Sequence, residues 1–141
     1  MRDKKQNKLI TIGIIMIATK NFNPISDPKL LCTCQHERCD KRSVSQEHLD
    51  RIQMVRGIVN HPLQVSSGGR CPYHPDEIHR TTPADHQRGV GTDVTVNGST
   101  RGNVVIAGLH AGCNAIGIAN RFVHLGYRAE LDVGHTTMWT Y

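Results

Sequence analysis

The residues with the clearest potential for chemistry lie in one short polar stretch. The segment "TTPADHQRGVGTDVTV" places His86 and Asp93 seven residues apart, with Gly89 and Gly91 between them. Imidazole and carboxylate groups are common zinc ligands, and a catalytic zinc site has three protein ligands and one open position. Glycines permit the tight backbone turns that bring two such side chains to one ion. The alternative is a polar loop that leads into a strand.

A third candidate ligand occurs later in the chain, in the segment "FVHLGY". Strand alternation places Phe122, His124 and Gly126 on one face. If this strand lies beside "TDVTV", His124 can reach the same ion as the other two side chains. A single histidine, one of nine in this chain, is more often a surface or core residue than a ligand. The set as a whole therefore indicates a Zn²⁺ site with three candidate ligands: His86, Asp93 and His124.

The five cysteines pose a separate question. Three are crowded together and two are isolated: Cys32, Cys34 and Cys39, then Cys71 and Cys113. The odd number favours reduced thiols over a disulfide scaffold. A zinc knuckle built from Cys32, Cys34, His36 and Cys39 is the alternative, although this spacing matches the usual CxxC pairs poorly. A nucleic-acid-binding module based on that knuckle is one hypothesis for the function.

Length and charge narrow these possibilities. The 141 residues suit one compact domain. The net charge of +5 favours polyanionic partners such as nucleic acid, an anionic membrane or an acidic cell-wall polymer. Only six aromatic residues are available to stack on bases, which argues against a nucleic-acid partner.

The elements that must position these residues follow from hydrophobic periodicity and capping signals. A helix is predicted from Ser43 to Val59, with Ser43 and Gln46 forming a capping box and Pro62 following its end. A second helix is predicted within 98–112, capped by Ser99 or Thr100. Alternating segments predict strands at 63–65, 92–96, 115–120, 121–128 and 138–141. The expected fold class is α+β, with a small antiparallel sheet and helices packed on one side.

The beginning of the chain has its own character. A basic segment is followed by the apolar run "LITIGIIMIAT" at 9–19, which is too short to span a bilayer as a helix. Its length suits a signal-peptide core, but no small-x-small cleavage site follows, so a buried strand is favoured. Residues 1–20 are therefore separated as an N-terminal apolar segment, 21–141 form the expected single domain, and the localisation stays open.

Two motifs resemble a known family. "SSGGRCPYH" and "DHQRGVGTD" are similar to segments of the zinc D-Ala-D-Ala peptidases, whose clan includes L-Ala-D-Glu endopeptidases of phage lysins and the hedgehog-type fold; the resemblance covers about 21–141. It implies that His86, Asp93 and His124 bind zinc, and that Arg70 holds a substrate carbonyl or carboxylate and stabilises the oxyanion. Arg70 in a structural salt bridge is the alternative. The implied activity is hydrolysis of an amide bond in a peptidoglycan stem peptide, as in an endolysin or virion-associated wall hydrolase.

The chain departs from this family pattern at several positions. Two changes are mild: Ala84 replaces a serine and Gly91 replaces an alanine. Three others remove the acid–base residues that members carry near the second histidine ligand: Arg121, Phe122 and Gly126. Glu130 and Asp132 are the acids available in the following segment. A catalytically weak or inactive zinc-binding relative, acting as a cell-wall-binding or structural virion component, is therefore the second hypothesis.

Overall fold

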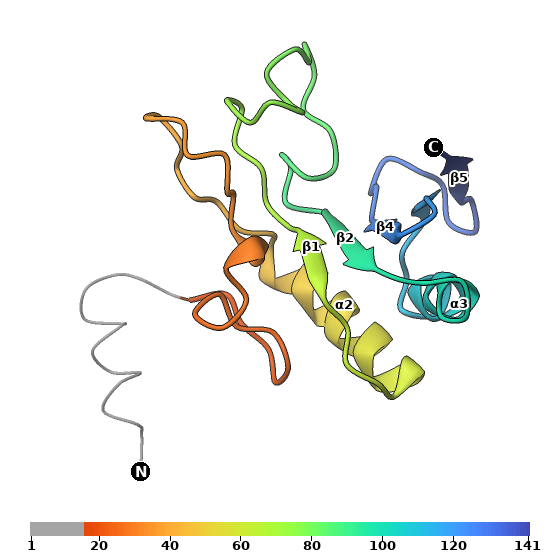
Figure 1. Ribbon diagram of the computed structural model, residues 1–141. Coiled ribbons are helices and arrows are strands. Elements are labelled where there is room, and N and C mark those ends of the chain that lie inside the picture. Colours follow the sequence, from red (N-terminus) through yellow and green to blue (C-terminus); the bar gives the residue numbers. More distant parts are fainter. Residues whose placement is uncertain (1–15) are drawn as a thin grey trace.

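The computed structural model describes residues 16–141, which form two α-helices, one short 3₁₀ helix and five strands (Figure 1). In chain order these are η1 (Pro28–Leu30), α2 (Gln46–Val59), β1 (Val65–Ser67), β2 (Gly91–Thr95), α3 (Arg101–His110), β3 (Ala115–Ile118), β4 (Phe122–Gly126) and β5 (Thr137–Thr140). Most of the apolar run at 9–19 lies outside the described residues. Within the part that is described, neither helix has the length and apolar character needed to cross a bilayer.

The five strands form one mixed sheet in the order β1-β2-β4-β3-β5. Three of the pairings are antiparallel, as expected, but β3 and β5 are parallel. The physical reason lies in the connection at 127–136. β4 ends beside Ala115, where β3 begins, and β5 also begins beside Ala115. Because the connection stays at that edge, β5 must run in the same direction as β3.

The helices pack against one face of the sheet, which confirms the expected α+β class. Their apolar side chains share a core with inward-facing strand residues: Leu49, Ile52, Val55, Val104, Ala107, Val94, Val123 and Leu125. Gly108 allows α3 to approach β4 closely, because a Cβ at this position would lie 2.5 Å from Leu125 Cδ2. Strand alternation then leaves Asp93 and His124 on the opposite face.

The N-terminal boundary of α2 differs from the prediction. The N-cap is Ser45, whose hydroxyl accepts a hydrogen bond from the His48 amide at 3.1 Å, so the predicted cap at Ser43 is wrong. Ser43 Oγ is buried and has no hydrogen-bond partner in the part of the chain that the structure describes. At the other end, Asn60 adopts a left-handed conformation (φ 55°) and Pro62 follows, so the helix stops where the sequence indicated.

Smaller differences concern α3 and β1. Thr100 occupies the N-cap position of α3, but its side chain makes no capping bond; Asn97 Oδ1 accepts from the Ser99 and Thr100 amides instead. β1 lies two residues later than the predicted strand at 63–65, because its ladder with β2 pairs Val65 with Val94.

Candidate metal centre

The three predicted ligands come together on the open face of the sheet. Asp93 on β2 is directly opposite His124 on β4, and His86 approaches from the preceding loop. Asp93 Oδ1 lies 3.0 Å from His124 Nδ1 and 3.2 Å from His86 Nε2, and these two nitrogens are 3.2 Å apart. All three residues are buried. The geometry is that of a group able to hold one metal ion.

The outer nitrogen of each histidine has an acceptor. His86 Nδ1 lies 2.7 Å from the Gly68 carbonyl oxygen, and His124 Nε2 lies 2.8 Å from Asp85 Oδ2. When these nitrogens carry the protons, His86 Nε2 and His124 Nδ1 direct lone pairs toward Asp93. Metal-binding histidines commonly have such outer-shell partners, which fix the tautomer and the orientation of the ring. Two imidazole nitrogens and one carboxylate oxygen therefore fit a divalent cation such as Zn²⁺.

Burial and hydrogen bonding shift the pKa values of two residues in this cluster in opposite directions. Burial by itself raises the pKa of Asp93, but hydrogen bonds from His124 and His86 outweigh it and hold this pKa well below its ordinary value. Burial lowers the pKa of His124, whereas hydrogen bonds to Asp85 and Asp93 raise it, and the net shift is upward.

Asp85 is a functional residue that sequence reasoning missed. Its side chain is 5% exposed and accepts from His124 on one side and from Arg128 on the other, where Arg128 Nε lies 2.9 Å from Asp85 Oδ1. Burial raises the pKa of this carboxyl, but these hydrogen bonds dominate and bring it to about 2, so Asp85 is an anion at neutral pH. The feature of the sequence that could have indicated this role is that Asp85 directly precedes the candidate ligand His86.

The same residue explains two departures from the family pattern. A Cβ at Gly126 would lie 2.7 Å from Asp85 Oδ2, and a Cβ at Gly91 would lie 2.7 Å from Asp85 Cβ. Both glycines therefore leave the space that the Asp85 side chain fills. An acidic group does lie beside His124 in this chain, but residue 85 supplies it rather than residue 126.

Arg70 lies at the rim of the cluster, with a side chain that is 14% exposed. Its Nη2 lies 3.3 Å from Asp93 Oδ2, its Nη1 lies 3.5 Å from Glu77 Oε2, and its Nε donates to Ser67 Oγ at 3.0 Å. Arg70 thus makes the structural salt bridges that the sequence analysis gave as the alternative to substrate binding. By holding Oδ2 of Asp93, the guanidinium leaves Oδ1 directed at the two histidines.

The cluster opens into a cavity of about 530 Å³. Cationic, acidic and aromatic side chains line it, among them Arg80, Arg128, Asp76, Glu77, Trp139 and Tyr141. Gly117 makes room for Trp139, because a Cβ there would lie 2.7 Å from the indole ring. Glu130 and Asp132 do not line this cavity; Glu130 pairs with Arg88 at 3.0 Å. The acids considered from sequence are therefore replaced by Asp76, Glu77 and Asp85.

Comparison with known proteins identifies the family of the chain. A family model described as Peptidase M15 matches residues 25–126, so the chain belongs to the M15 peptidase family. The resemblance seen in the two sequence motifs is confirmed, and the chain is a member of a family of metallopeptidases. No curated protein and no solved structure matches the chain.

Proposed function

We propose that this protein is a zinc-dependent peptidase that hydrolyses an amide bond in peptidoglycan stem peptides, with residues 21–141 as its catalytic unit. The observation that carries the proposal is the buried cluster of His86, Asp93 and His124 at the floor of an open cavity. Structural zinc sites are closed by four protein ligands, whereas catalytic sites have three and one open position. Three ligands facing a cavity are the catalytic arrangement.

In this proposal some residues bind the metal and others orient those ligands. His86, Asp93 and His124 would hold a zinc ion, which would supply Lewis-acid polarisation and a more acidic bound water at neutral pH. Asp85 holds His124 in orientation, the Gly68 carbonyl does the same for His86, and Arg70 holds Asp93. The side of the Arg70 guanidinium that lines the cavity is available to a substrate carbonyl or carboxylate, because a planar fork suits such groups.

We infer a peptide with a carboxylate as substrate from the arginines of the cavity lining, which lie beside the acids Asp76, Glu77 and Asp85. Arg70, Arg80 and Arg128 all contribute to its wall. Arg80 and Arg128 are partly exposed, with 43% and 32% of their side chains accessible, and can meet a carboxylate. Stem peptides of the D-Ala-D-Ala or L-Ala-D-Glu type carry carboxylates next to the amide bonds that would be cut. The net charge of +5 suits an acidic cell-wall polymer as well.

Glu77 is our candidate for the proton acceptor. Its side chain is 1% exposed, it lines the cavity, and its Oε1 has no hydrogen-bond partner in the described residues. A positioned acid–base group contributes about 10²–10⁴-fold to a rate. The second candidate function, a zinc-binding relative with little or no activity, is favoured by the residues at 121, 122 and 126, which cannot serve as acids or bases in the family positions.

The experiment that tests the proposal is digestion of peptidoglycan by the zinc-loaded protein, with released peptides identified by mass spectrometry. We expect a product that depends on zinc, and its mass identifies the bond. His124→Ala is the matched variant, since it removes one ligand and should remove product formation. A fully zinc-occupied protein that releases no product from several wall types would refute the enzyme and support the silent relative.

A further inference from the structure

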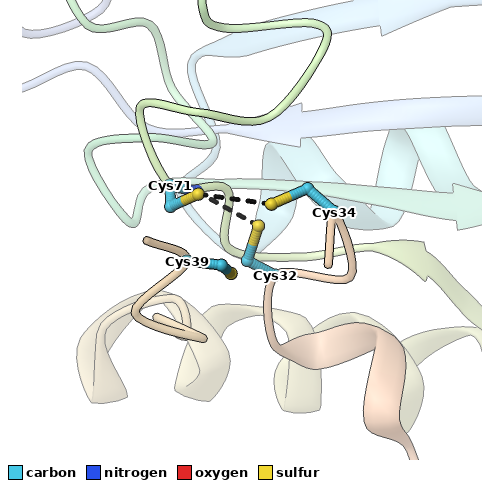
Figure 2. Close-up of side chains that lie close together, drawn as sticks. All are labelled: Cys32, Cys34, Cys39 and Cys71. Atoms are coloured by element: carbon cyan, nitrogen blue, oxygen red, sulfur yellow. Dashed lines mark hydrogen bonds between the residues drawn. The ribbon is translucent and has the colours of Figure 1, made fainter. Parts of the chain in front are cut away.

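Four cysteines gather at a second place in the molecule, away from the cavity. Cys32, Cys34 and Cys39 lie in the loop after η1, and Cys71 lies after β1 (Figure 2). Their four sulfur atoms all lie within 4.8 Å of one another. Cys34 Sγ and Cys71 Sγ are 3.4 Å apart, and none of the four thiols is in a disulfide.

These separations are those of a tetrahedral zinc site. Zinc–sulfur bonds are about 2.3 Å long, so neighbouring sulfurs in a regular tetrahedron lie about 3.8 Å apart. Cys32 and Cys71 are buried, with 6% and 0% exposure, and the other two are half-buried. Four thiols facing one small volume have few good hydrogen-bond acceptors among themselves, whereas four thiolates would all be satisfied by one Zn²⁺.

Backbone amides support the sulfur atoms. The Cys71 amide donates to Cys32 Sγ at 3.3 Å, and the Lys41 amide donates to Cys39 Sγ at 3.3 Å. Hydrogen bonds of this kind to ligand sulfurs are part of the outer shell of metal sites. Gln35 and Lys41, each next to or near a ligand, adopt positive φ angles of 59° and 51°. The loop therefore accepts backbone strain in order to turn its cysteines inward.

The structure also corrects the ligand set that the sequence suggested. His36 does not join the cluster: its ring stacks on Tyr73 with centroids 4.5 Å apart, and its Nδ1 accepts from the Arg38 amide at 3.0 Å. Cys71, which is isolated in the sequence, takes the fourth position. A glycine pair brings it there, since a Cβ at Gly69 would lie 2.2 Å from the Arg42 carbonyl oxygen.

We propose that Cys32, Cys34, Cys39 and Cys71 bind a second metal ion, a structural Zn²⁺, which fastens the N-terminal loop to the segment that carries Arg70. The need for such a fastening is visible in the fold. Between residues 16 and 45, the only regular element that the structure shows is η1, three residues long. Segments with little regular structure commonly depend on a metal or disulfides for order.

The proposed ion would also support the His86 cluster. Cys71 directly follows Arg70, whose amide donates to the His86 carbonyl at 3.2 Å. The Gly68 carbonyl, three residues before Cys71, accepts from His86 Nδ1. Movement of Cys71 would therefore disturb two backbone groups that orient His86. A change in the His86 cluster should affect the cysteines less, because the cysteine loop does not line the cavity.

The test is a count of bound metal in four proteins purified under reducing conditions with zinc. We expect two zinc ions per chain in the wild type, one in Cys34→Ser/Cys39→Ser and one in His86→Ala/His124→Ala. Cys113→Ser, which removes a buried thiol elsewhere in the core, should keep two. Cobalt in place of zinc should give sulfur-to-metal charge-transfer absorption that survives the double histidine change and disappears with the double cysteine change. A double cysteine variant with the metal content of wild type would overturn the proposal.

A second measurement on the wild type avoids dependence on variants that fold poorly. In the zinc-loaded protein, we expect iodoacetamide to label the four cysteines only after a chelator is added. Labelling at the same rate with and without zinc, or a pair of disulfides in the freshly reduced protein, would also overturn the second site. These results are independent of peptidase activity, so a failure of the proposed function leaves them readable.

Discussion

The two candidate metal clusters of this protein are built in opposite ways. His86, Asp93 and His124 lie on or next to paired strands, and their centre opens into a cavity. The four cysteines lie in loops, and two of them are buried while the other two are half-buried. Paired strands position the residues of the first cluster, whereas metal binding at the second cluster would itself stabilise the loops around it. We therefore expect changes in the first to affect chemistry and changes in the second to affect stability.

The largest expected effect is a crossover between these two properties. His124→Ala should abolish hydrolysis but lower the denaturation midpoint only modestly, whereas Cys71→Ser should lower the midpoint strongly and reduce hydrolysis without abolishing it. Zinc-finger folding shows how completely a structural zinc can control stability. Parallel thermal melts and peptide-release assays on both variants provide the measurement. Equal losses of stability from both changes would contradict the proposed division of roles.

A smaller effect is expected from Asp85→Asn. The amide keeps the shape of the side chain but removes the charge that faces His124, and loss of an outer-shell partner commonly costs about 10–100-fold in metal affinity or activity. Competition with a zinc chelator measures the affinity. Asp76→Asn is the control, because Asp76 lines the same cavity but is exposed and makes no contact with a ligand histidine. An unchanged affinity in Asp85→Asn would remove Asp85 from the site.

Glu77→Gln tests the proton acceptor at the same cavity. We expect kcat to fall by about 10²-fold or more, the lower part of the range for acid–base groups, with zinc content unchanged. Because Glu77 also pairs with Arg70 and Arg80, a thermal melt must accompany the kinetic assay. A variant with wild-type kcat would exclude this role.

The smallest expected effect is on how the free energy of unfolding depends on pH. It rests on a difference between two buried histidines, His124 and His48. His124 has carboxylate partners, whereas the buried Nε2 of His48 on α2 has no hydrogen-bond partner within residues 16–141. Burial, together with the positive charge of Arg51, lowers the pKa of His48 to about 3. In the unfolded chain a histidine has a pKa of about 6.5. The unfolded state thus binds the extra proton, so this contribution to stability is complete above about pH 6.5 and is lost as the pH falls toward 3.

His48→Leu should therefore lose less stability than the wild type between pH 7 and pH 5. Urea unfolding at both pH values, in the same zinc-containing buffer, gives the difference between the two proteins and cancels the titration of other groups. His110→Gln is the control, since His110 is exposed at the end of α3. Identical pH dependence in wild type and His48→Leu would show that His48 does not remain neutral in the folded protein.

Comparison of the two clusters also shows how much of the site was accessible from sequence. His86 and Asp93 are close in the chain, and the alternation of "TDVTV" and "FVHLGY" allowed His124 to be added, because neighbouring strands with period 2 place facing residues together. Asp85 was missed although it precedes His86. Its importance depends on the space left by Gly91 and Gly126, and a sequence does not show which side chain fills a space.

The sequence by itself determined the class of fold, the family and the three candidate ligands, because hydrophobic period, helix-stop residues and motif spacing are local properties. The tertiary structure decided the rest. It chose Ser45 over Ser43 as the cap, made β5 parallel to β3, and replaced His36 by Cys71 in the cysteine cluster. Each of these outcomes depends on which distant segments meet, and that is set by packing of the whole chain rather than by neighbouring residues.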